Sequence, residues 1–283
     1  MRLSRVALST TVTLALLVGC GRLRYAPSDA ALGETPDTGA LDAALDAALD
    51  VGPVTGDAGR DAAVGCIVRA PEAYWPMDAV DVTTSLVLDR GGRGHVGQIF
   101  GDPLPSTAPG RLGQALDFTS TTLARVESTV PFDQDQHTVS LWMRNDDPAV
   151  DQGVFCVTPT PLPEAPRYCL WLTNRLGPVS LCINGGTGDC WGVTRDDLVG
   201  RWVHVVAVFA NGPTTNGRLY IDGLPVTMEC RFGTCDQSRV AQGPLMLGMN
   251  EDVYAWHGLL DDVRFFRGAL DDTEAAALFA CTP

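Results

Sequence analysis

The nine cysteines are the residues of this chain with the clearest chemical meaning. None stands in a Cys-x-x-Cys pair, and the nearest spacing is that between Cys230 and Cys235. The four histidines lie far apart, and no two have the spacing of metal ligands. A cytosolic protein of 283 residues rarely keeps so many thiols without a metal site or a redox motif. The cysteines are therefore expected to form disulfides in an oxidising compartment.

The sequence contains no motif that supports nucleophilic catalysis. The chain has no Gly-x-Ser-x-Gly sequence, which would place a serine on a nucleophile elbow. His204 lies in an apolar run, which favours a role in the core or in a groove over catalysis. His257, next to Trp256, is expected in a solvated loop. Composition alone leaves a Ser/His/Asp triad open, and nothing in the sequence predicts one.

Composition describes a folded, acidic protein. Hydrophobic residues make up 45% of the chain and charged residues 19%, which is enough apolar material for a sizeable core. The net charge is −14, and every basic residue is Arg. An acidic chain without basic runs repels phosphate backbones, so nucleic acid is not an expected partner. An acidic surface does suit calcium.

The first twenty residues have the pattern of an export signal. Arg2 and Arg5 precede the apolar run 6–18, which is too short to span a bilayer of about 30 Å. The run ends in Leu-Val-Gly before Cys20, which resembles the lipobox of bacterial lipoproteins. This resemblance implies that the signal peptide, residues 1–19, is removed and that Cys20 carries lipid. The protein is then anchored in the cell envelope, at the outer membrane or the cell surface, with eight cysteines left to pair.

Residues 20–65 predict a disordered acidic tether, because they are rich in Ala, Asp, Gly, Pro and Thr. Leu41, Leu45 and Leu49 would share one face of a helix, but the repeat is too short to sustain a helix alone. A helical patch that binds a partner is the alternative. From Cys66 to Pro283 short apolar runs are cut by Gly, Pro, Asn and Asp, which predicts a single domain.

The domain is predicted to be all-β with one short C-terminal helix. Residues 139–144 alternate apolar and polar side chains, and 201–209 is nearly continuously apolar, as in a strand covered on both faces. Asp222-Gly223 between apolar runs predicts a hairpin, and 245–249 and 259–266 predict two more strands. Asp271 with Glu274 three residues later predicts a helix N-terminus. This pattern favours a two-sheet antiparallel sandwich or jelly roll.

The order of several sequence blocks resembles a known family, the laminin-G-like, concanavalin A-like jelly rolls of the bacterial type. The resemblance covers about Cys66 to Cys281 and is most specific in the segment before the last helix. The blocks are Tyr74–Asp78, Asp89–Gly97, Gly113–Phe118, Val139–Arg144, Arg201–Ala207, Leu219–Gly223 and Gly258–Phe266. The family implies two facing antiparallel sheets, one of them concave, with the chain ends close together.

Because the implied fold brings the chain ends together, Cys66 is expected to pair with Cys281. The other cysteines flank short loops and are expected to pair locally. These expected pairs are Cys156–Cys169, Cys182–Cys190 and Cys230–Cys235. The family does not generally carry these cysteines, so the pairing is inferred from this chain.

The resemblance also implies candidate binding residues. Jelly rolls of this type often hold one structural Ca²⁺ near the chain ends, and Asp78, Asp89 and Asp261 are the candidate ligands. The alternative is that these residues cap turns. Sugars stack on aromatic rings and hydrogen-bond to polar groups, and the candidates for this role lie near the cysteine-rich hairpins. They are Tyr168, Trp171, Trp191, Asn184 and Arg195, with burial of the aromatic rings as the alternative.

Three functions remain for the domain. The favoured one is a membrane-tethered, non-catalytic module that recognises a glycan or a surface protein. The second is a structural or adhesive envelope lipoprotein that assembles with its own copies. The third is a glycoside hydrolase with an atypical site, because some relatives of the fold are glycosidases. The third is disfavoured, since the six Glu residues from Cys66 onward are scattered and no Glu-x-Asp-x-x-Glu strand is present.

Overall fold

The computed structural model describes residues 69–119, 124–147, 151–157, 168–174, 179–184, 189–236, 238–239, 243–250 and 254–281. The predicted signal peptide, Cys20, the tether and Cys66 lie outside these residues. Within them the chain forms two large antiparallel sheets, two small two-stranded sheets and one α-helix. In the described part of the chain, no helix is both long enough and apolar enough to cross a bilayer.

The first large sheet has eight strands. Along its path these are β15 (Leu224–Pro225), β14 (Arg218–Ile221), β12 (Trp202–Ala210), β7 (Gln136–Asn145), β21 (Gly258–Arg267), β5 (Gln114–Asp117) and β4 (Ser106–Pro109). The eighth strand, β1 (Ala73–Trp75), also pairs with β21. The long central strands β12, β7 and β21 are paired along nearly their whole length and form the centre of this sheet.

The second large sheet has nine strands and carries the cysteine-rich hairpins. In order these are β16 (Glu229–Phe232), β11 (Cys190–Thr194), β10 (Ser180–Asn184), β9 (Tyr168–Thr173), β8 (Gln152–Val157), β18 (Leu245–Leu247), β6 (Arg125–Ser128), β3 (Gly97–Phe100) and β2 (Leu86–Val87). The small sheets pair β13 (Gly212–Pro213) with β17 (Ser238–Arg239), and β19 (Met249–Asn250) with β20 (Tyr254–Ala255). Two 3-10 turns, η1 (Asp196–Leu198) and η2 (Thr214–Asn216), flank β12.

The hydrophobic core lies between the two large sheets. Alternate residues of each strand point inward, as the pleat requires. Leu141, Val205 and Phe265 come from the first sheet, and Phe155 and Leu170 from the second. All are buried, and the contacts between the two sheets confirm the predicted two-layer sandwich.

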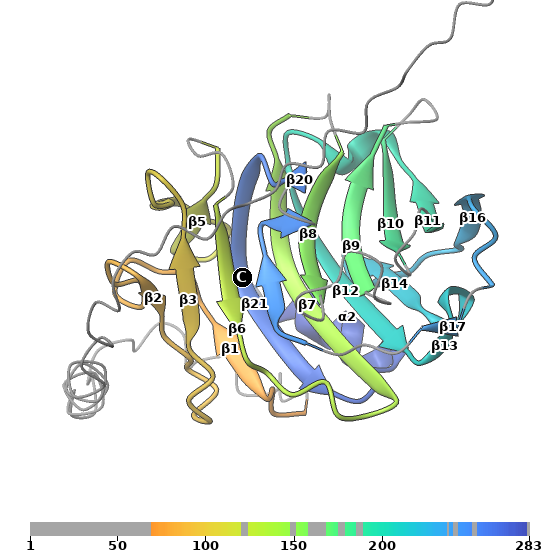
Figure 1. The fold of residues 1–283 in the computed structure, drawn as a ribbon, viewed down its shortest axis with the longest axis horizontal. Coiled ribbons are helices and arrows are strands. Elements are labelled where there is room, and N and C mark those ends of the chain that lie inside the picture. The colour runs from red at the N-terminus through yellow and green to blue at the C-terminus, as the bar shows by residue number, and fades with distance from the viewer. Residues whose placement is uncertain are drawn as a thin grey trace, which may run out of the picture. The chain divides into compact units, whose positions relative to one another are not determined.

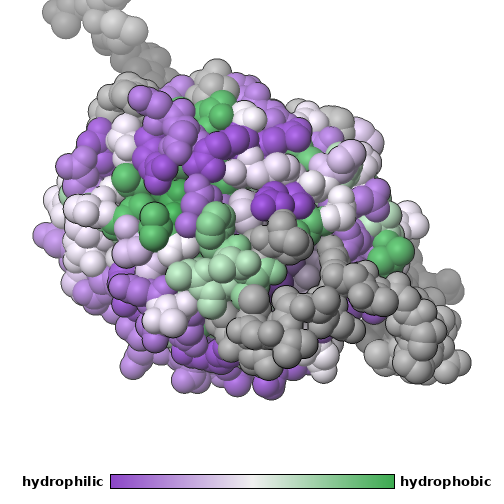
Figure 2. All heavy atoms as spheres, turned by 180° about the vertical axis from the view of Figure 1, so that it is seen from behind, coloured by the Kyte–Doolittle hydropathy of each residue, from purple (hydrophilic) through white to green (hydrophobic). Residues whose placement is uncertain are grey.

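A helix covers the outer face of the eight-stranded sheet. Helix α2 (Asp272–Ala280) has the predicted capping box, in which the Asp271 side chain and Glu274 satisfy each other's backbone amides. Ala275 and Leu278 pack on Val206 and Tyr220 of the sheet. Figure 1 shows the two sheets stacked, with α2 behind them. Figure 2 views that side, which is mostly hydrophilic with small hydrophobic areas.

Most of the strands read from the sequence are present. Strand β12 is buried along eight of its nine residues, which confirms that both its faces are covered. The hairpin between β14 and β15 turns at Asp222 and Gly223, whose positive φ angles of 51° and 77° are those of a type I′ turn. Strand β7 differs from the expected half-exposed strand, since Ser140 and Trp142 are also buried on its outer face.

Candidate functional site

The predicted sugar-stacking rings Tyr168 and Trp171 do not present an exposed face. Tyr168 is 1% exposed and points into the core, where its ring packs edge-on against Phe209. Trp171 points to the other side of β9 and is 2% exposed, in a cluster with Cys182, Cys190 and Phe232. The stacking role expected for these two residues is therefore corrected, because packing occupies both rings.

Of the other three predicted sugar contacts, Asn184 and Trp191 lie on the paired strands β10 and β11, and Arg195 directly follows β11. Trp191 on β11 is half-buried, and its Nε1 donates to the carbonyl of Gly217 at 3.2 Å. Asn184 ends β10, where its backbone pairs with Cys169. The Arg195 guanidinium donates twice to the Asp197 carboxylate, at 2.7 and 2.6 Å. Burial of Tyr168 and Trp171 leaves Trp191 as the one partly exposed ring among the three aromatic candidates.

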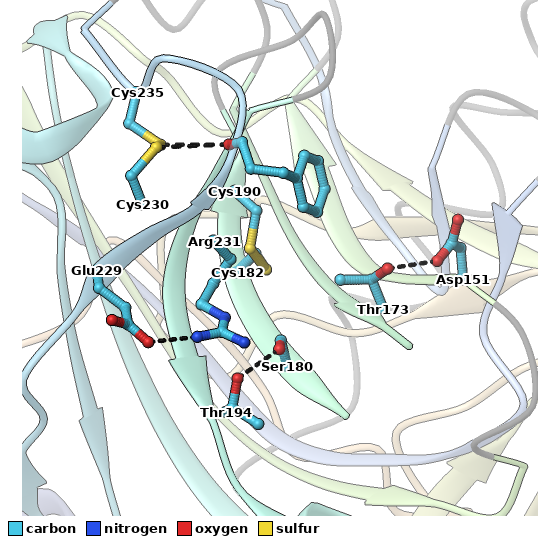
Figure 3. The surroundings of a disulfide bond; sticks show 11 residues. Asp151, Thr173, Ser180, Cys182, Cys190, Thr194, Glu229, Cys230, Arg231 and Cys235 are labelled. Atoms are coloured by element: carbon cyan, nitrogen blue, oxygen red, sulfur yellow. Dashed lines mark hydrogen bonds and ion pairs between the residues drawn. A yellow bond between two sulfur atoms is a disulfide. The ribbon is translucent and has the colours of Figure 1, made fainter. Parts of the chain in front are cut away.

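The disulfides follow the predicted local pairing. Cys156–Cys169 joins neighbouring strands β8 and β9, Cys182–Cys190 joins β10 and β11, and Cys230–Cys235 closes the turn after β16. Figure 3 shows the last two together with the Ser180–Thr194 hydrogen bond across β10 and β11. Cys281 is also disulfide-bonded, and its expected partner, Cys66, lies outside the described residues. Disulfides persist in oxidising compartments, so these bridges indicate an exported protein.

The three predicted calcium ligands do not converge. The Asp89 carboxylate accepts hydrogen bonds from the backbone amides of Tyr74, Gly91 and His95, at 2.7 to 2.9 Å. The Asp89 carboxylate thus caps the turn 89–95 and ties it to Tyr74, which matches the turn-capping role expected as the alternative to calcium. Within the described ranges, no group of three or more His, Cys, Asp or Glu side chains is placed to hold a metal ion.

Asp78 and Asp261, in contrast, hold the same turn. Asp78 Oδ1 accepts from the amide of Gln114, and Asp261 Oδ2 accepts from the amides of Arg111 and Leu112. Asp261 is fully buried, and its Oδ1 has no hydrogen-bond partner. Two carboxylates around one turn, one with an unsatisfied buried oxygen, fit a structural cation whose other oxygens come from backbone and water.

A bulge in β21 places a second carboxylate, that of Asp262, beside Asp261. The register shifts between Asp261 and Arg264, and Asp262 adopts a positive φ of 53°. Consecutive residues of a regular strand point to opposite faces, but the bulge turns Asp262 to the same outer side as Asp261. Asp262 accepts from Tyr74 Oη at 2.6 Å and from Arg264 at 2.5 Å. Burial, with the nearby Asp262 and Asp78 carboxylates, raises the pKa of Asp261 to about 7 against the opposing effect of the two amides.

A Ser–His pair is present but lies beneath the helix. Ser140 Oγ and His204 Nε2 are 3.0 Å apart on neighbouring strands, and the His204 ring packs against Trp142 and Phe279. His204 Nδ1 has no hydrogen-bond partner, so no carboxylate orients the ring as in a triad. Burial lowers the pKa of His204 to about 3. The geometry supports the expected core role for His204.

An open pocket at one end of the sandwich gathers polar side chains that the sequence did not single out. We call it the amide pocket, because carboxamides dominate its lining. Its volume is about 1070 Å³, and its lining residues are Gln134, Asp135, Gln136, Ala210, Asn211, Gly212, Asn216 and Gly268. They come from the start of β7, the end of β12, the η2 loop and the residue after β21. Only pairing in the sheet brings these segments together, so no local motif could have located the pocket.

Hydrogen bonds fix the walls of the amide pocket. The Asn211 amide donates to the Asp135 carbonyl at 2.8 Å, and Asn216 Nδ2 donates to the Asn211 carbonyl at 3.1 Å. The Gly268 amide donates to the Gln136 carbonyl at 2.8 Å. Gly212 has a φ of 99°, and a Cβ there would lie 2.9 Å from Asn216 Nδ2. Glycine is therefore required at this position for the loop to close.

Facing antiparallel sheets with a helix on one outer face define a concanavalin A-like sandwich. The family model described as the Concanavalin A-like lectin/glucanases superfamily (Laminin_G_3) matches residues 118–276. This match covers more than half of the chain, so the chain belongs to that superfamily. A comparison with curated proteins finds no match.

Several solved structures share the fold at low sequence identity. Domain 4 of an extracellular arabinanase from Geobacillus stearothermophilus, in complex with arabinotriose, has a TM-score of 0.52 and 19% identity over 75% of this chain and 97% of that domain. A Trypanosoma rangeli sialidase has a TM-score of 0.53 and 14% sequence identity. The match covers 76% of this chain and 33% of the sialidase. The binding domain of botulinum neurotoxin serotype D/C has a TM-score of 0.51 and 12% sequence identity. The match covers 76% of this chain and 52% of that domain. These similarities establish the fold.

Proposed function

We propose that the domain is a non-catalytic module that binds a glycan in the amide pocket. The observation that carries the proposal is the pocket's lining of exposed Gln134, Gln136 and Asn216, with half-buried Asn211 between them. Carboxamides donate and accept hydrogen bonds at once, as sugar hydroxyls do. The arabinanase domain of the same fold was solved with arabinotriose, which supports a sugar as the ligand.

The geometry of the Ser140–His204 pair supports a role without chemistry. A nucleophile and its base must reach the substrate, whereas His204 is fully buried and Phe279 of α2 packs against its ring. The membership in a superfamily of both lectins and glucanases leaves either role open. The amide pocket contains one carboxylate, Asp135, and a glycosidase of the usual kind needs two.

We also propose a structural Ca²⁺ at Asp78 and Asp261, without Asp89. When bound, the ion would neutralise the buried Asp261 carboxylate and so hold the turn 110–114 against β21. The support for this proposal is the unsatisfied Oδ1 of Asp261 and the shared turn. Calcium at this site would stabilise the fold. Neither Asp78 nor Asp261 lines the amide pocket.

Binding of the full chain to a glycan array, followed by titration calorimetry on the hits, tests the glycan proposal. Gln136→Ala and Asn216→Ala are each expected to weaken binding about 2- to 10-fold, the effect of one lost hydrogen bond. Gln98→Ala, on β3 and outside the pocket lining, is the matched control. Absence of glycan binding together with concentration-dependent self-association would favour the structural alternative. Turnover that disappears on changing one acidic residue would favour a hydrolase.

A further inference from the structure

The lining of the amide pocket has a bias in charge as well as in hydrogen bonding. Its eight residues include four carboxamides and one carboxylate, Asp135, and they include no basic residue. We propose that the pocket selects neutral glycans and rejects sugars that carry carboxylate, sulfate or phosphate groups. This inference rests on the proposed glycan-binding function and specifies the chemical class of the ligand.

Two guanidinium groups lie beside the lining residue Gly268, and both are engaged in ion pairs. Arg69 donates to the carbonyls of Arg267 and Ala269 and lies 3.1 Å from Glu274. Arg267 immediately precedes the lining residue Gly268, and its guanidinium lies 3.1 Å from Asp133 and 3.6 Å from Glu72. Asp133 and Asp135 are both exposed beside the pocket; Arg267 pairs with Asp133, whereas no basic side chain of the described residues pairs with Asp135. An anionic sugar would meet an uncompensated carboxylate there. At about 4 Å, repulsion between two unit charges near a protein surface weakens binding by tenfold or more.

The lining carboxamides fill complementary roles toward a neutral ligand. The Gln136 side chain is exposed and makes no hydrogen bond with the described residues, so both its oxygen and its nitrogen can face a ligand. Asn216 uses its nitrogen on the Asn211 carbonyl and has its oxygen left as an acceptor. Such a set matches neighbouring hydroxyls, each of which is donor and acceptor.

Residues beneath the pocket hold this lining in place. Tyr168 Oη donates to the carbonyl of Ala210, and Trp191 Nε1 donates to that of Gly217, next to Asn216. The Gln134 amide donates to His137 Nε2 at 3.2 Å, and the His137 ring stacks on Phe265. Tyr168, Trp191 and His137 thus act as positioning residues for a polar site. A preformed lining reduces the entropy lost on binding, which permits selection by hydrogen bonds alone.

Calorimetry with matched neutral and acidic sugars tests the selection. The probes are arabinotriose and galactotriose as neutral sugars, and trigalacturonic acid as the acidic counterpart of galactotriose. The wild-type chain is expected to bind a neutral probe at least tenfold more tightly than the acid. Asp135→Asn removes the charge and keeps the size of the side chain, so it is expected to reduce this preference several-fold. Asp196→Asn, which removes the same charge on η1, is expected to leave the preference unchanged.

The outcomes separate the ligand class from the glycan-binding function itself. The wild-type chain could bind the acid more tightly than the neutral probes while Gln136→Ala still weakens glycan binding. That result would overturn the selection for neutral sugars but support glycan binding at the pocket. A preference that Asp135→Asn does not reduce would also overturn the selection. If none of the sugars on the array or among these probes binds, the proposed function fails. Comparison of the thermal unfolding of each variant with that of the wild-type chain excludes misfolding as the cause.

Discussion

The buried carboxylate of Asp261 has no basic partner among the described residues, and its Oδ2 accepts hydrogen bonds from the backbone amides of Arg111 and Leu112. Calcium at Asp78 and Asp261 is expected to raise the Tm of the full chain. Saturation at 100 times the dissociation constant stabilises a folded protein by about 2.7 kcal/mol. For a domain of this size that shift is roughly 5–10 °C. Differential scanning calorimetry with CaCl₂ and with a chelator measures it.

Two variants make the calcium prediction specific. Asp261→Asn removes the charge that the ion would neutralise, so the Tm of this variant is expected not to respond to calcium. Asp89→Asn is expected to lower the Tm by weakening the turn that Asp89 caps, while the response to calcium persists. The calcium prediction is contradicted if the Tm of the wild-type chain is the same with calcium and with chelator. If Asp261→Asn is then more stable than wild type, Asp261 is a buried protonated acid.

At the scale of elements, three central strands and α2 create a polar layer without solvent. His204 of β12, Trp142 of β7 and Asp261 of β21 stand directly opposite one another in register. Each carries a buried polar atom without a hydrogen-bond partner. Regular alternation would expose this outer face, but α2 and the turn 110–114 cover it. Burial beneath α2 and the turn 110–114 therefore lowers the pKa of His204 and raises that of Asp261.

The buried histidines predict acid sensitivity in a defined window. The pKa of His204 is about 3 and that of His137 about 4 in the folded chain, because burial disfavours the charged ring, whereas both are near 6.5 when unfolded. Below about pH 6.5 the unfolded chain binds more protons, so stability falls as the pH is lowered toward 4. Each buried histidine contributes a slope of about 1.4 kcal/mol per pH unit.

Urea unfolding at several pH values isolates the His204 contribution. The raised pKa of Asp261 makes the folded chain bind more protons between pH 7 and 3.8, so its contribution to stability rises as the pH falls. The measured slope therefore combines opposing contributions from the histidines and Asp261. The difference between wild type and His204→Gln cancels Asp261 and His137, and stability of the variant is expected to fall less steeply between pH 6 and pH 4. His257→Gln, outside this layer, is the control. Parallel curves for wild type and His204→Gln would contradict the assignment.

At the scale of the whole molecule, the disulfides indicate an exported protein, the compartment that the predicted signal peptide also implies. Cys156–Cys169 and Cys182–Cys190 join neighbouring strands within the nine-stranded sheet. Lipid on Cys20 stays a prediction from the sequence. Intact mass spectrometry of the protein from a bacterial host is expected to show loss of residues 1–19, added acyl mass on Cys20 and no free thiol. Cys20→Ser is expected to release the chain from the membrane. A retained Met1 or free thiols would contradict the prediction.

The sequence by itself determined the layers of the fold and the local pairs of cysteines. Alternating strands, the Asp222-Gly223 turn and the capping box at Asp271 depend on residues close together in the chain, where periodicity and turn chemistry act directly. The same is true of Cys230 and Cys235, which are five residues apart. Through the family resemblance, Asp78 and Asp261 were predicted as ligands of one calcium ion; the structure shows both accepting hydrogen bonds from the turn 110–114, and calcium binding stays a prediction.

Only the tertiary structure decided which polar and aromatic residues remain accessible. Packing of Phe209 and Phe232 against Tyr168 and Trp171 removed the predicted stacking rings from the surface. The amide pocket unites segments separated by more than 130 positions, such as Gln136 and Gly268, through pairing of β7 with β12 and β21. Exposure depends on what each face of a strand meets across the sheet and above it, and the sequence pattern records only the alternation.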